Sequence, residues 1–401
     1  MEWPTKKISN ACDIVNGLWS GKEPPYIKVG VIRNTNFTRE GALDDSAIAY
    51  LNVERKKFKK RKLSYGDIIL EKSGGGPKQP VGRVIIFDKK DGDFSFSNFT
   101  SAIRVKNSTE LDFNFLHKFL FFLYISGTTE KMQSHSTGIR NLDLKLYMEI
   151  EIPLPPLAEQ RRIVKLLDEV FEGIKLAKEN TEKNLRNSKE LFESYLQGVF
   201  ENPGKDWEEK KLGEILQKTE TINPLNNSDK EFIYIDVSSV NKKNFTIENT
   251  SLIIGKNAPS RARKLVRTGD VIFATVRPTL RRIAIIPQKL NEQVCSTGYF
   301  VLRTKEQLNN KLMFYFVQTK AFNEKMEKLQ KGASYPAVTD GEVKNQIISY
   351  PKSLIEQKAI VAKLDALATE TGKLEGIYRQ KLADLEELKK AVLRKAFSGE
   401  L

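Results

Sequence analysis

The strongest constraint on this chain is an internal repeat. The segment Leu157–Asp168 returns as Leu354–Asp365, 197 residues later, and the same spacing holds without a gap as far as Phe200 and Phe397. In both copies apolar residues recur by alternating fours and threes, the spacing of a coiled-coil seam. A gap-free match of this length is typical of a duplication. We therefore predict two long helices, each about 63 Å in length at 1.5 Å per residue.

The seam of each predicted helix weakens near its middle. In the first copy, the predicted seam continues beyond Ala177 through Thr181, Asn184, Ser188, Leu191, Tyr195 and Val199. In the second copy, it continues beyond Leu374 through Tyr378, Lys381, Leu385, Leu388, Val392 and Ala396. Polar seam positions set the register of paired helices or meet a partner's surface.

The repeat divides the chain into four parts. Prolines 153, 155 and 156 fix an extended stretch before the first helix, and Pro203 follows it. We predict a first globular domain over residues 1–152, a first helix within 153–202, a second globular domain over 203–350 and a second helix within 351–401. Both globular parts contain a Gly-Asp turn that leads into a β-branched strand, followed later by an amphipathic helix. We expect two α+β domains of one fold.

The distribution of net charge along the chain indicates which parts bind a polyanion. The chain has 401 residues with 66 Lys and Arg against 51 Asp and Glu, a formal charge of +15. Residues 159–200 carry eight basic and eight acidic side chains, and residues 356–401 carry nine and eight, so the globular parts hold +14. This distribution favours nucleic acid as the partner over an acidic membrane surface.

Scarce cysteine and histidine exclude several classes of protein. Two cysteines and two histidines are too few for a disulfide framework or a His-rich metal site. The N-terminus has no apolar signal region, and no apolar run approaches the ~18 residues of a membrane span. We predict a cytoplasmic protein without a membrane partner.

Two basic stretches are candidates for contact with DNA. The first packs seven cations into residues 55–62, and its candidate residues are Lys56, Lys57, Lys59, Lys60 and Arg61. The second is rich in arginine, and its candidates are Arg261, Arg263, Arg277, Arg281 and Arg282. Such runs can be merely solvated faces, but basic globular parts beside neutral helices favour phosphate contacts. Arginine can also read guanine through its planar fork.

Three loops add further candidates. The Gly-rich segment 71–83 contains Lys78 and Arg83, the segment 135–141 contains Arg140, and the segment 332–337 contains Tyr335. These loops could lie along a DNA duplex, or they could be hairpin connections and packing turns.

Catalytic motifs are incomplete. Glu23-Pro-Pro-Tyr26 resembles the tetrapeptide of amino-methyltransferases that positions a flipped adenine, but Glu replaces Asp or Asn, and no S-adenosylmethionine loop accompanies it. There is no phosphate-binding P-loop, and Gly74–Gly76 lacks the spacing of a dinucleotide site. We therefore assign no catalytic, cofactor-binding or metal-binding residue. The alternatives are a DNA methyltransferase or nuclease with its own catalytic site, and a coiled-coil assembly protein.

Several motifs together resemble a known family, the specificity subunits of Type I restriction-modification enzymes. They are the proline-rich segment 152–160 with its helix, the second copy at Leu354-Ile-Glu-Gln357, and the closing segment Lys395–Leu401. The segment that precedes the second predicted helix, Tyr350-Pro-Lys-Ser353, departs from the Pro-Leu-Pro-Pro pattern of the family.

The resemblance implies a non-catalytic subunit that binds double-stranded DNA. Its globular parts would be target recognition domains, each reading one half of a split, asymmetric sequence. Its helices would pair antiparallel, set the spacing of the half-sites and dock modification (methyltransferase) subunits. Restriction (translocase and nuclease) subunits would join them. S-adenosylmethionine, ATP and Mg²⁺ would belong to those partners, with no cofactor bound by this chain.

Overall fold

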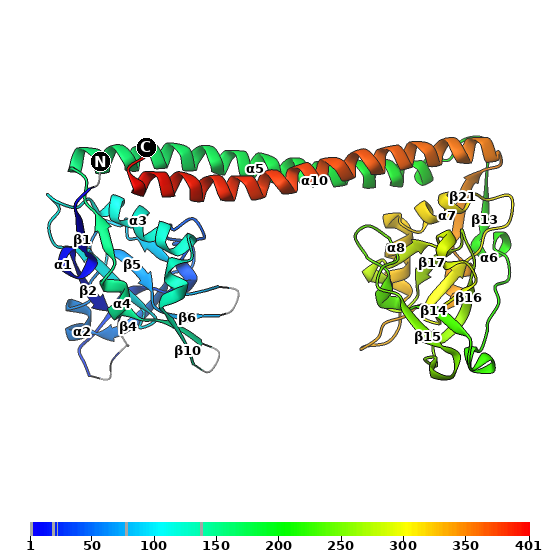
Figure 1. Ribbon diagram of the computed structural model, residues 1–401, viewed down its shortest axis with the longest axis horizontal. Helices are drawn as coiled ribbons and strands as arrows, with labels where there is room; N and C mark the ends of the chain where they lie inside the picture. Colours follow the sequence, from blue (N-terminus) through cyan, green and yellow to red (C-terminus); the bar gives the residue numbers. More distant parts are fainter. Residues whose placement is uncertain (1–2, 18–20, 22, 77–78, 137–138) are drawn as a thin grey trace. The chain divides into compact units, whose positions relative to one another are not determined.

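The computed structural model describes residues 3–17, 21, 23–76, 79–136 and 139–401, and the chain forms two compact units (Figure 1). Unit 1 is Met1–Thr181 together with Gln380–Leu401, and unit 2 is Glu182–Arg379. Each unit therefore combines one globular domain with parts of both long helices.

The globular domain of unit 1 contains small sheets. Their strand orders are β2-β9-β5-β7, β4-β3-β8 and β10-β11-β6, and β1 pairs with β12. The strands are β1 Thr5–Lys7, β2 Cys12–Asn16, β3 Tyr26–Ile32, β4 Ala49–Glu54, β5 Ile68–Glu71, β6 Ser73–Gly75, β7 Val84–Ile86, β8 Phe94–Phe96, β9 Thr100–Val105, β10 Gln133–Ser136, β11 Ile139–Leu142 and β12 Glu151–Pro153. The helices are α1 Ile8–Ala11, α2 Arg55–Lys59, α3 Phe113–Ile125 and α4 Leu144–Met148.

The globular domain of unit 2 has strand orders β15-β14-β19-β16 and β18-β17-β20, and β13 pairs with β21. Its strands are β13 Trp207–Lys211, β14 Glu231–Ile235, β15 Ser251–Ile254, β16 Ala262–Val266, β17 Val271–Ala274, β18 Ile283–Ile285, β19 Gln293–Ser296, β20 Tyr299–Leu302 and β21 Ile347–Pro351. Its helices are α6 Leu212–Ile215, α7 Asn310–Phe316, α8 Lys320–Leu329 and α9 Asp340–Lys344.

The two domains share one topology. In unit 1, β3 pairs in parallel with β8 and antiparallel with β4, and in unit 2, β14 pairs in the same way with β19 and β15. Likewise β5 lies between β9 and β7, as β17 lies between β20 and β18. The domains differ in that β2 extends one sheet of unit 1, whereas β16 extends the other sheet of unit 2. In addition, the sheet β10-β11-β6 belongs to unit 1, and α8 follows α7 in unit 2. The prediction of two α+β domains of one fold is confirmed.

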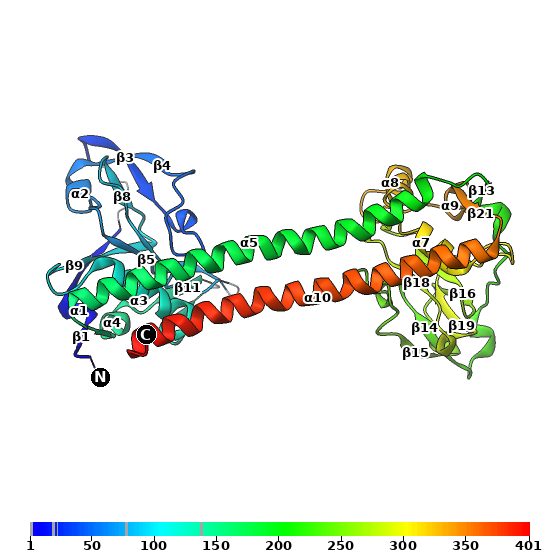
Figure 2. The same ribbon diagram turned by 90° about the horizontal axis from the view of Figure 1, so that it is seen from above.

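Two long helices follow the globular domains. Helix α5 spans Leu157–Glu201 and α10 spans Leu354–Ser398, 45 residues each. They run in opposite directions (Figure 2), and the predicted antiparallel packing is confirmed. No helix among the described residues is long and apolar enough to cross a membrane.

The seam between the helices differs from the prediction in the later half of each helix. In α5, Asn184 and Leu191 are exposed, whereas Phe192 is half-buried and Leu196 is buried. In α10, Lys381 and Leu388 are exposed, and the buried face moves to positions such as Leu393. An α-helix lags a seven-residue repeat by about 20° per heptad, so the buried stripe moves one residue later. A prediction that assigns seam positions by a strict seven-residue spacing does not include this shift.

A buried glutamine attaches the start of each long helix to its globular domain. Gln160 accepts a hydrogen bond from the Asp112 backbone N–H (2.8 Å) and donates to the carbonyls of Glu110 (2.9 Å) and Pro155 (2.8 Å). Asp112 is the N-cap of α3, because its carboxylate accepts the backbone N–H groups of Asn114 and Phe115. The glutamine therefore joins α5 to the start of α3.

Unit 2 repeats these contacts at the equivalent residue. Gln357 accepts the Asn309 N–H (2.7 Å) and donates to the carbonyls of Gln307 (2.8 Å) and Pro351 (2.8 Å). Asn309 caps α7 as Asp112 caps α3. Both glutamine side chains are fully buried. A buried amide is stable only with its hydrogen-bond partners, so these bonds fix where each helix begins.

Apolar packing completes each attachment. In unit 1, Phe115 and Leu116 of α3 share a core with Ile163 and Leu167 of α5 and with Leu393 of α10. In unit 2, the core of Leu312 and Met313 of α7 includes Leu196 of α5 and Leu364 of α10. Each domain therefore packs against both helices.

The buried glutamine gives a prediction about stability. Gln357→Ala should lower the free energy of unfolding of unit 2 by about 2 kcal/mol, because buried backbone groups lose their partners at about 1–3 kcal/mol each. Hydrogen exchange of α7 and β21, followed by mass spectrometry across a denaturant series, measures the change. Gln288→Ala, on an exposed side chain of unit 2 that accepts a hydrogen bond from Thr268, should stay within about 0.5 kcal/mol. Equal effects of the two variants would contradict this role.

Candidate nucleic-acid interface

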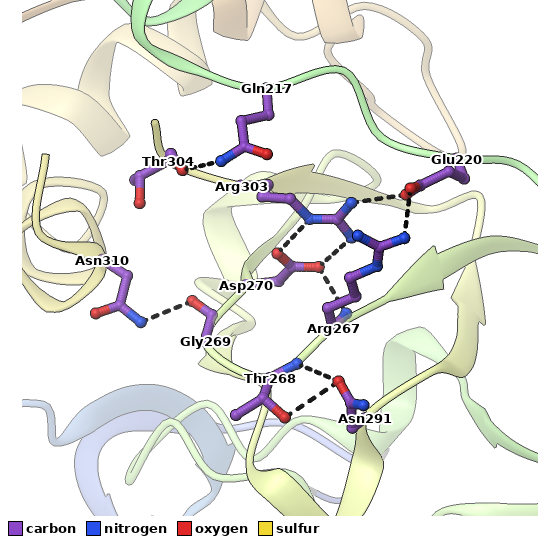
Figure 3. A network of polar contacts seen from close by, with 10 residues as sticks. All are labelled: Gln217, Glu220, Arg267, Thr268, Gly269, Asp270, Asn291, Arg303, Thr304 and Asn310. Carbon is purple, nitrogen blue, oxygen red and sulfur yellow. Dashed lines mark hydrogen bonds and ion pairs between the residues drawn. The ribbon is translucent and has the colours of Figure 1, made fainter. Parts of the chain in front are cut away.

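An Asp–Arg ion pair holds the Gly-Asp turn of each domain. Both aspartates are buried, whereas the arginine is 10% exposed in unit 2 and 44% exposed in unit 1. In unit 1, Asp67 accepts two hydrogen bonds from Arg104 of β9, from Nε at 2.7 Å and from Nη2 at 2.6 Å. In unit 2, Asp270 accepts the same pair of hydrogen bonds from Arg303, the residue after β20, both at 2.9 Å (Figure 3). These hydrogen bonds are the main cause of a raised pKa for each arginine. The pairs fasten β5 and β17 to the neighbouring strands.

The network in Figure 3 also engages part of the arginine-rich stretch. Glu220 accepts from Arg267 (2.7 Å) and from Arg303 (2.6 Å). These contacts hold the pKa of Glu220 below its usual range, with the Arg303 hydrogen bond as the largest cause. Arg267 is therefore part of the domain's framework.

Arg83 has a similar internal role. It is 13% exposed and pairs with the carboxylate of Glu71 through Nε (2.7 Å) and Nη2 (2.9 Å). It also donates to the backbone carbonyls of Asn34 (3.0 Å) and Phe37 (3.3 Å). These bonds anchor the Gly-rich segment at its two ends. The structure does not support the prediction that Arg83 contacts DNA, because its donors bond within the protein.

Two further predicted arginines, Arg281 and Arg282, are half-buried and bond within unit 2. Arg281 donates to the carbonyl of Gln318 (2.6 Å) and lies 4.0 Å from Glu193 of α5. Arg282 donates to the carbonyls of Val237 (2.8 Å) and Val240 (3.2 Å). These bonds hold both half-buried side chains on unit 2, and their contact with DNA stays a prediction.

The lysine-rich run of unit 1 remains a candidate. It forms α2 and the turn after it, with Phe58 buried beneath the helix. Lys57 lies 3.4 Å from Glu54, and the Arg61 Nε donates to the Asn16 carbonyl at 3.0 Å. The other three predicted cations are exposed and have no ion-pair partner among the described residues: Lys56, Lys59 and Lys60. They suit contacts with a phosphate backbone.

The sheet β10-β11-β6 brings together two of the predicted loops. Arg140 of β11 lies opposite Gly75 of β6. Its side chain is half-buried and has no hydrogen-bond partner among the described residues. In Figure 1, the β10–β11 hairpin extends away from α5. Lys78 lies outside the described residues.

Arg277 and Tyr335 form a stacked pair on the surface of unit 2. The guanidinium lies 4.7 Å from the centre of the Tyr335 ring, which is 69% exposed. The Arg277 Nη2 donates to the Ser334 carbonyl (3.1 Å), and its backbone N–H donates to the Pro336 carbonyl (2.7 Å). The arginine backbone is left-handed, with φ 51°. These contacts orient the guanidinium and leave Nε and Nη1 without a partner among the described residues.

Arg261 and Arg263 flank the start of β16. Arg261 is exposed, and its side chain has no partner among the described residues. Arg263 is half-buried and donates to the Ala262 carbonyl (3.0 Å). Arg261 is thus the freer of the two for contact with a ligand.

The sequence analysis did not predict one contact of a basic side chain, that of Lys72. The Lys72 ammonium donates to the Asn16 side-chain oxygen at 2.7 Å, and the carbonyl of the same residue accepts from Arg61. Partial burial lowers the pKa of Lys72. The sequence separates these cations, and only the fold brings them to one residue.

Comparison with known proteins assigns the family. A model of the Type I restriction modification DNA specificity domain matches residues 1–186 and 204–383. The chain belongs to this family. It is 26% identical to the MjaVIII specificity subunit of Methanocaldococcus jannaschii, over 71% of this chain and 70% of that protein. It is 24% identical to the EcoKI specificity subunit of Escherichia coli K12, over 100% of this chain and 89% of that protein.

A solved structure supports the same fold. It comes from work on complex assembly and conformational transition of a type I R-M system, and it matches with a TM-score of 0.79 and 19% identity, over 100% of this chain and 98% of that one. Membership of the specificity-subunit family confirms the predicted DNA-specificity role and the prediction that this is not the catalytic subunit. Nothing in these relatives supports the methyltransferase or nuclease alternative.

Burial also shifts the pKa of three side chains outside the candidate interface. Burial raises the pKa of the thiols of Cys12 and Cys295 to about 12, so both are protonated and poor nucleophiles near neutral pH. Burial lowers the pKa of His117 to about 4. Among the described residues, no three His, Cys, Asp or Glu side chains are grouped to hold a metal ion.

Proposed function

We propose that this specificity subunit reads a split, asymmetric sequence in double-stranded DNA, with one half-site for each unit. The observation that carries the proposal is that one repeated framework supports two chemically different basic surfaces. Unit 1 offers the lysines of α2 and the β10-β11-β6 sheet, and unit 2 offers Arg261 with the Arg277–Tyr335 pair. Different surfaces on equivalent domains suit two different half-sites.

The two surfaces suit different kinds of contact. Lysine is a flexible point charge, and the lysines of α2 would hold phosphates without regard to sequence. The Arg277 guanidinium is planar and already oriented by the Tyr335 ring and the Ser334 carbonyl. It can therefore present two donors to guanine O6 and N7 at little entropic cost.

The partners complete the proposed complex. Modification subunits, which would bind S-adenosylmethionine, dock on the long helices. Restriction subunits, which would use ATP and Mg²⁺, join them in the cytoplasm. Leu191 of α5 and Leu388 of α10 support the docking proposal, because they are equivalent in the repeat and are 55% and 47% exposed. An apolar anchor that is repeated on both helices suits two copies of one partner.

The Arg277 prediction concerns base specificity. Arg277→Lys should reduce discrimination at one base pair of one half-site by about 1–3 kcal/mol, because the lysine keeps the charge but loses the planar fork. Tyr335→Phe keeps the ring beneath the guanidinium and serves as the control. Binding of the chain with its modification subunits to a DNA library measures both. If Arg277→Lys weakens all sequences equally, Arg277 is a phosphate contact.

The α2 prediction concerns salt dependence. Replacing Lys56, Lys59 and Lys60 with glutamine should weaken binding to every duplex. It should also make the slope of log affinity against log salt shallower, by about 0.9 for each phosphate that the protein no longer neutralises. Lys62→Gln, in the same run but paired with Asp93 at 2.7 Å, is the matched control and should change the slope less. An unchanged slope in the triple variant would refute the phosphate contacts.

The docking prediction concerns stoichiometry. Leu191→Glu should remove one modification subunit from the assembled complex, Leu388→Glu should remove the other, and the double variant should bind neither, because each places a charge in an apolar contact. Mass photometry counts the subunits. Leu176→Glu is the control, since Leu176 is 52% exposed but corresponds to Lys373 in the repeat. Full stoichiometry in the double variant would contradict this docking surface.

A further inference from the structure

Unit 2 contains a cavity between its long helices and its globular domain. The cavity measures about 730 Å³, and residues from α5, α7, α10 and the loop after β14 line it. Its aromatic side comes from Phe192 of α5, Phe245 of the loop and Phe314 of α7. The Phe245 and Phe314 rings pack edge to face, 6.2 Å between centres. Helix α10 contributes small residues here, among them Ala368, Gly372 and Gly376, together with the paired Glu375 and Arg379.

The repeat explains why this space is open. Three residues that line it, Phe192, Gln318 and Ala368, are equivalent to Lys389, Phe121 and Phe171 of unit 1 by the spacing of 197 residues. The same spacing relates the Asp112 and Asn309 contacts of the buried glutamines, so it holds through α3 and α7.

In unit 1 the equivalent side chains fill this position. The Lys389 ammonium lies 4.8 Å from the centre of the Phe121 ring and 5.1 Å from that of Phe171. In unit 2, alanine replaces Phe171 and glutamine replaces Phe121. A β-carbon added to Gly372 or Gly376 would have no atom of another residue within 4 Å. The space therefore arises from particular substitutions between the two copies.

Charge around the cavity favours an acidic ligand. Its two acidic residues already have partners, since Glu375 accepts from Arg379 at 3.1 Å and Glu193 lies 4.0 Å from Arg281. Three lysines at its edge have no side-chain partner among the described residues: Lys189, Lys242 and Lys243. No acidic side chain among the described residues neutralises these three lysines, which lie beside the aromatic side of the cavity.

We propose that this cavity binds an acidic protein segment, which inserts an apolar side chain against Phe192, Phe245 and Phe314 and places carboxylates beside the three lysines. A concave aromatic wall accepts an apolar side chain, whereas the convex phosphate backbone of a duplex would leave it empty. Because the equivalent position in unit 1 is filled, the segment binds once per chain. This contact is additional to the repeated docking surface for modification subunits, and it makes the two halves of the chain unequal toward protein partners.

The test begins with a defined probe. A phage-displayed library of random dodecapeptides is selected on the full-length chain in the presence of excess duplex DNA, which covers the DNA-binding surface. We expect the enriched peptides to share an apolar residue flanked by Asp or Glu. The most enriched sequence is then synthesised with a fluorescent label, and its affinity is measured by anisotropy. Failure to enrich acidic peptides would overturn the proposal.

Variants of the chain localise the binding. Ala368→Phe restores the residue that fills unit 1 and should weaken peptide binding at least tenfold. Lys242→Glu with Lys243→Glu should do the same without entering the core, and keeps the test valid if Ala368→Phe disturbs folding. Lys205→Glu, an exposed lysine outside the cavity, should stay within twofold.

Measuring the affinity of the cavity variants for duplex DNA tests whether the cavity binds nucleic acid instead of a protein segment. The cavity variants should leave the affinity of the chain for duplex DNA unchanged, so failure of this proposal can be told apart from failure of the DNA-reading proposal. Peptide binding that survives both the Ala368→Phe and the double lysine variant would overturn the proposal. Loss of DNA affinity in the double lysine variant would also overturn it, because the lysines would then serve nucleic acid.

Discussion

The buried glutamine at the start of each long helix is the contact on which the rest of the structure depends. Gln160 and Gln357 have no exposed surface, and each bonds the N-cap residue of the neighbouring helix and two backbone carbonyls. A misplaced helix would leave these polar groups buried without partners, at about 1–3 kcal/mol each. The position of each domain on its own helix is therefore set by hydrogen bonds as well as by apolar packing.

The chain conserves its framework between the two copies and varies its surfaces. Both domains keep the glutamine contacts and an ion pair between a buried aspartate and an arginine, Asp67 with Arg104 and Asp270 with Arg303. On that common framework, unit 1 carries the lysines of α2, and unit 2 carries the stacked Arg277 and Tyr335. The repeat thus supplies two equal supports for two chemically different basic surfaces, which we propose contact DNA. The cavity beside Ala368 extends the same difference to protein contacts.

Periodicity and repetition predicted the two long helices and the two related domains, and the family resemblance supplied their antiparallel pairing. Burial in the structure then narrowed the set of candidate basic residues. The spacing of 197 residues predicts both helices, and the Gly-Asp turns predict two related domains. The sequence could not separate Arg277, which is exposed, from Arg281, which bonds the carbonyl of Gln318, because folding brings that carbonyl near. The ion pair of Arg83 could not be predicted for the same reason, since Glu71 lies twelve positions away in the chain.

Methylation mapping is the most direct test of the central claim that each unit reads its own half-site. The measurement is methylome sequencing of a host that carries this chain with its modification subunits, compared with the same host carrying a chain whose residues 203–350 come from another specificity subunit. The account predicts a split motif of two different halves, of which the exchange alters one and leaves the other unchanged. A continuous motif, or an exchange that alters both halves, would contradict it.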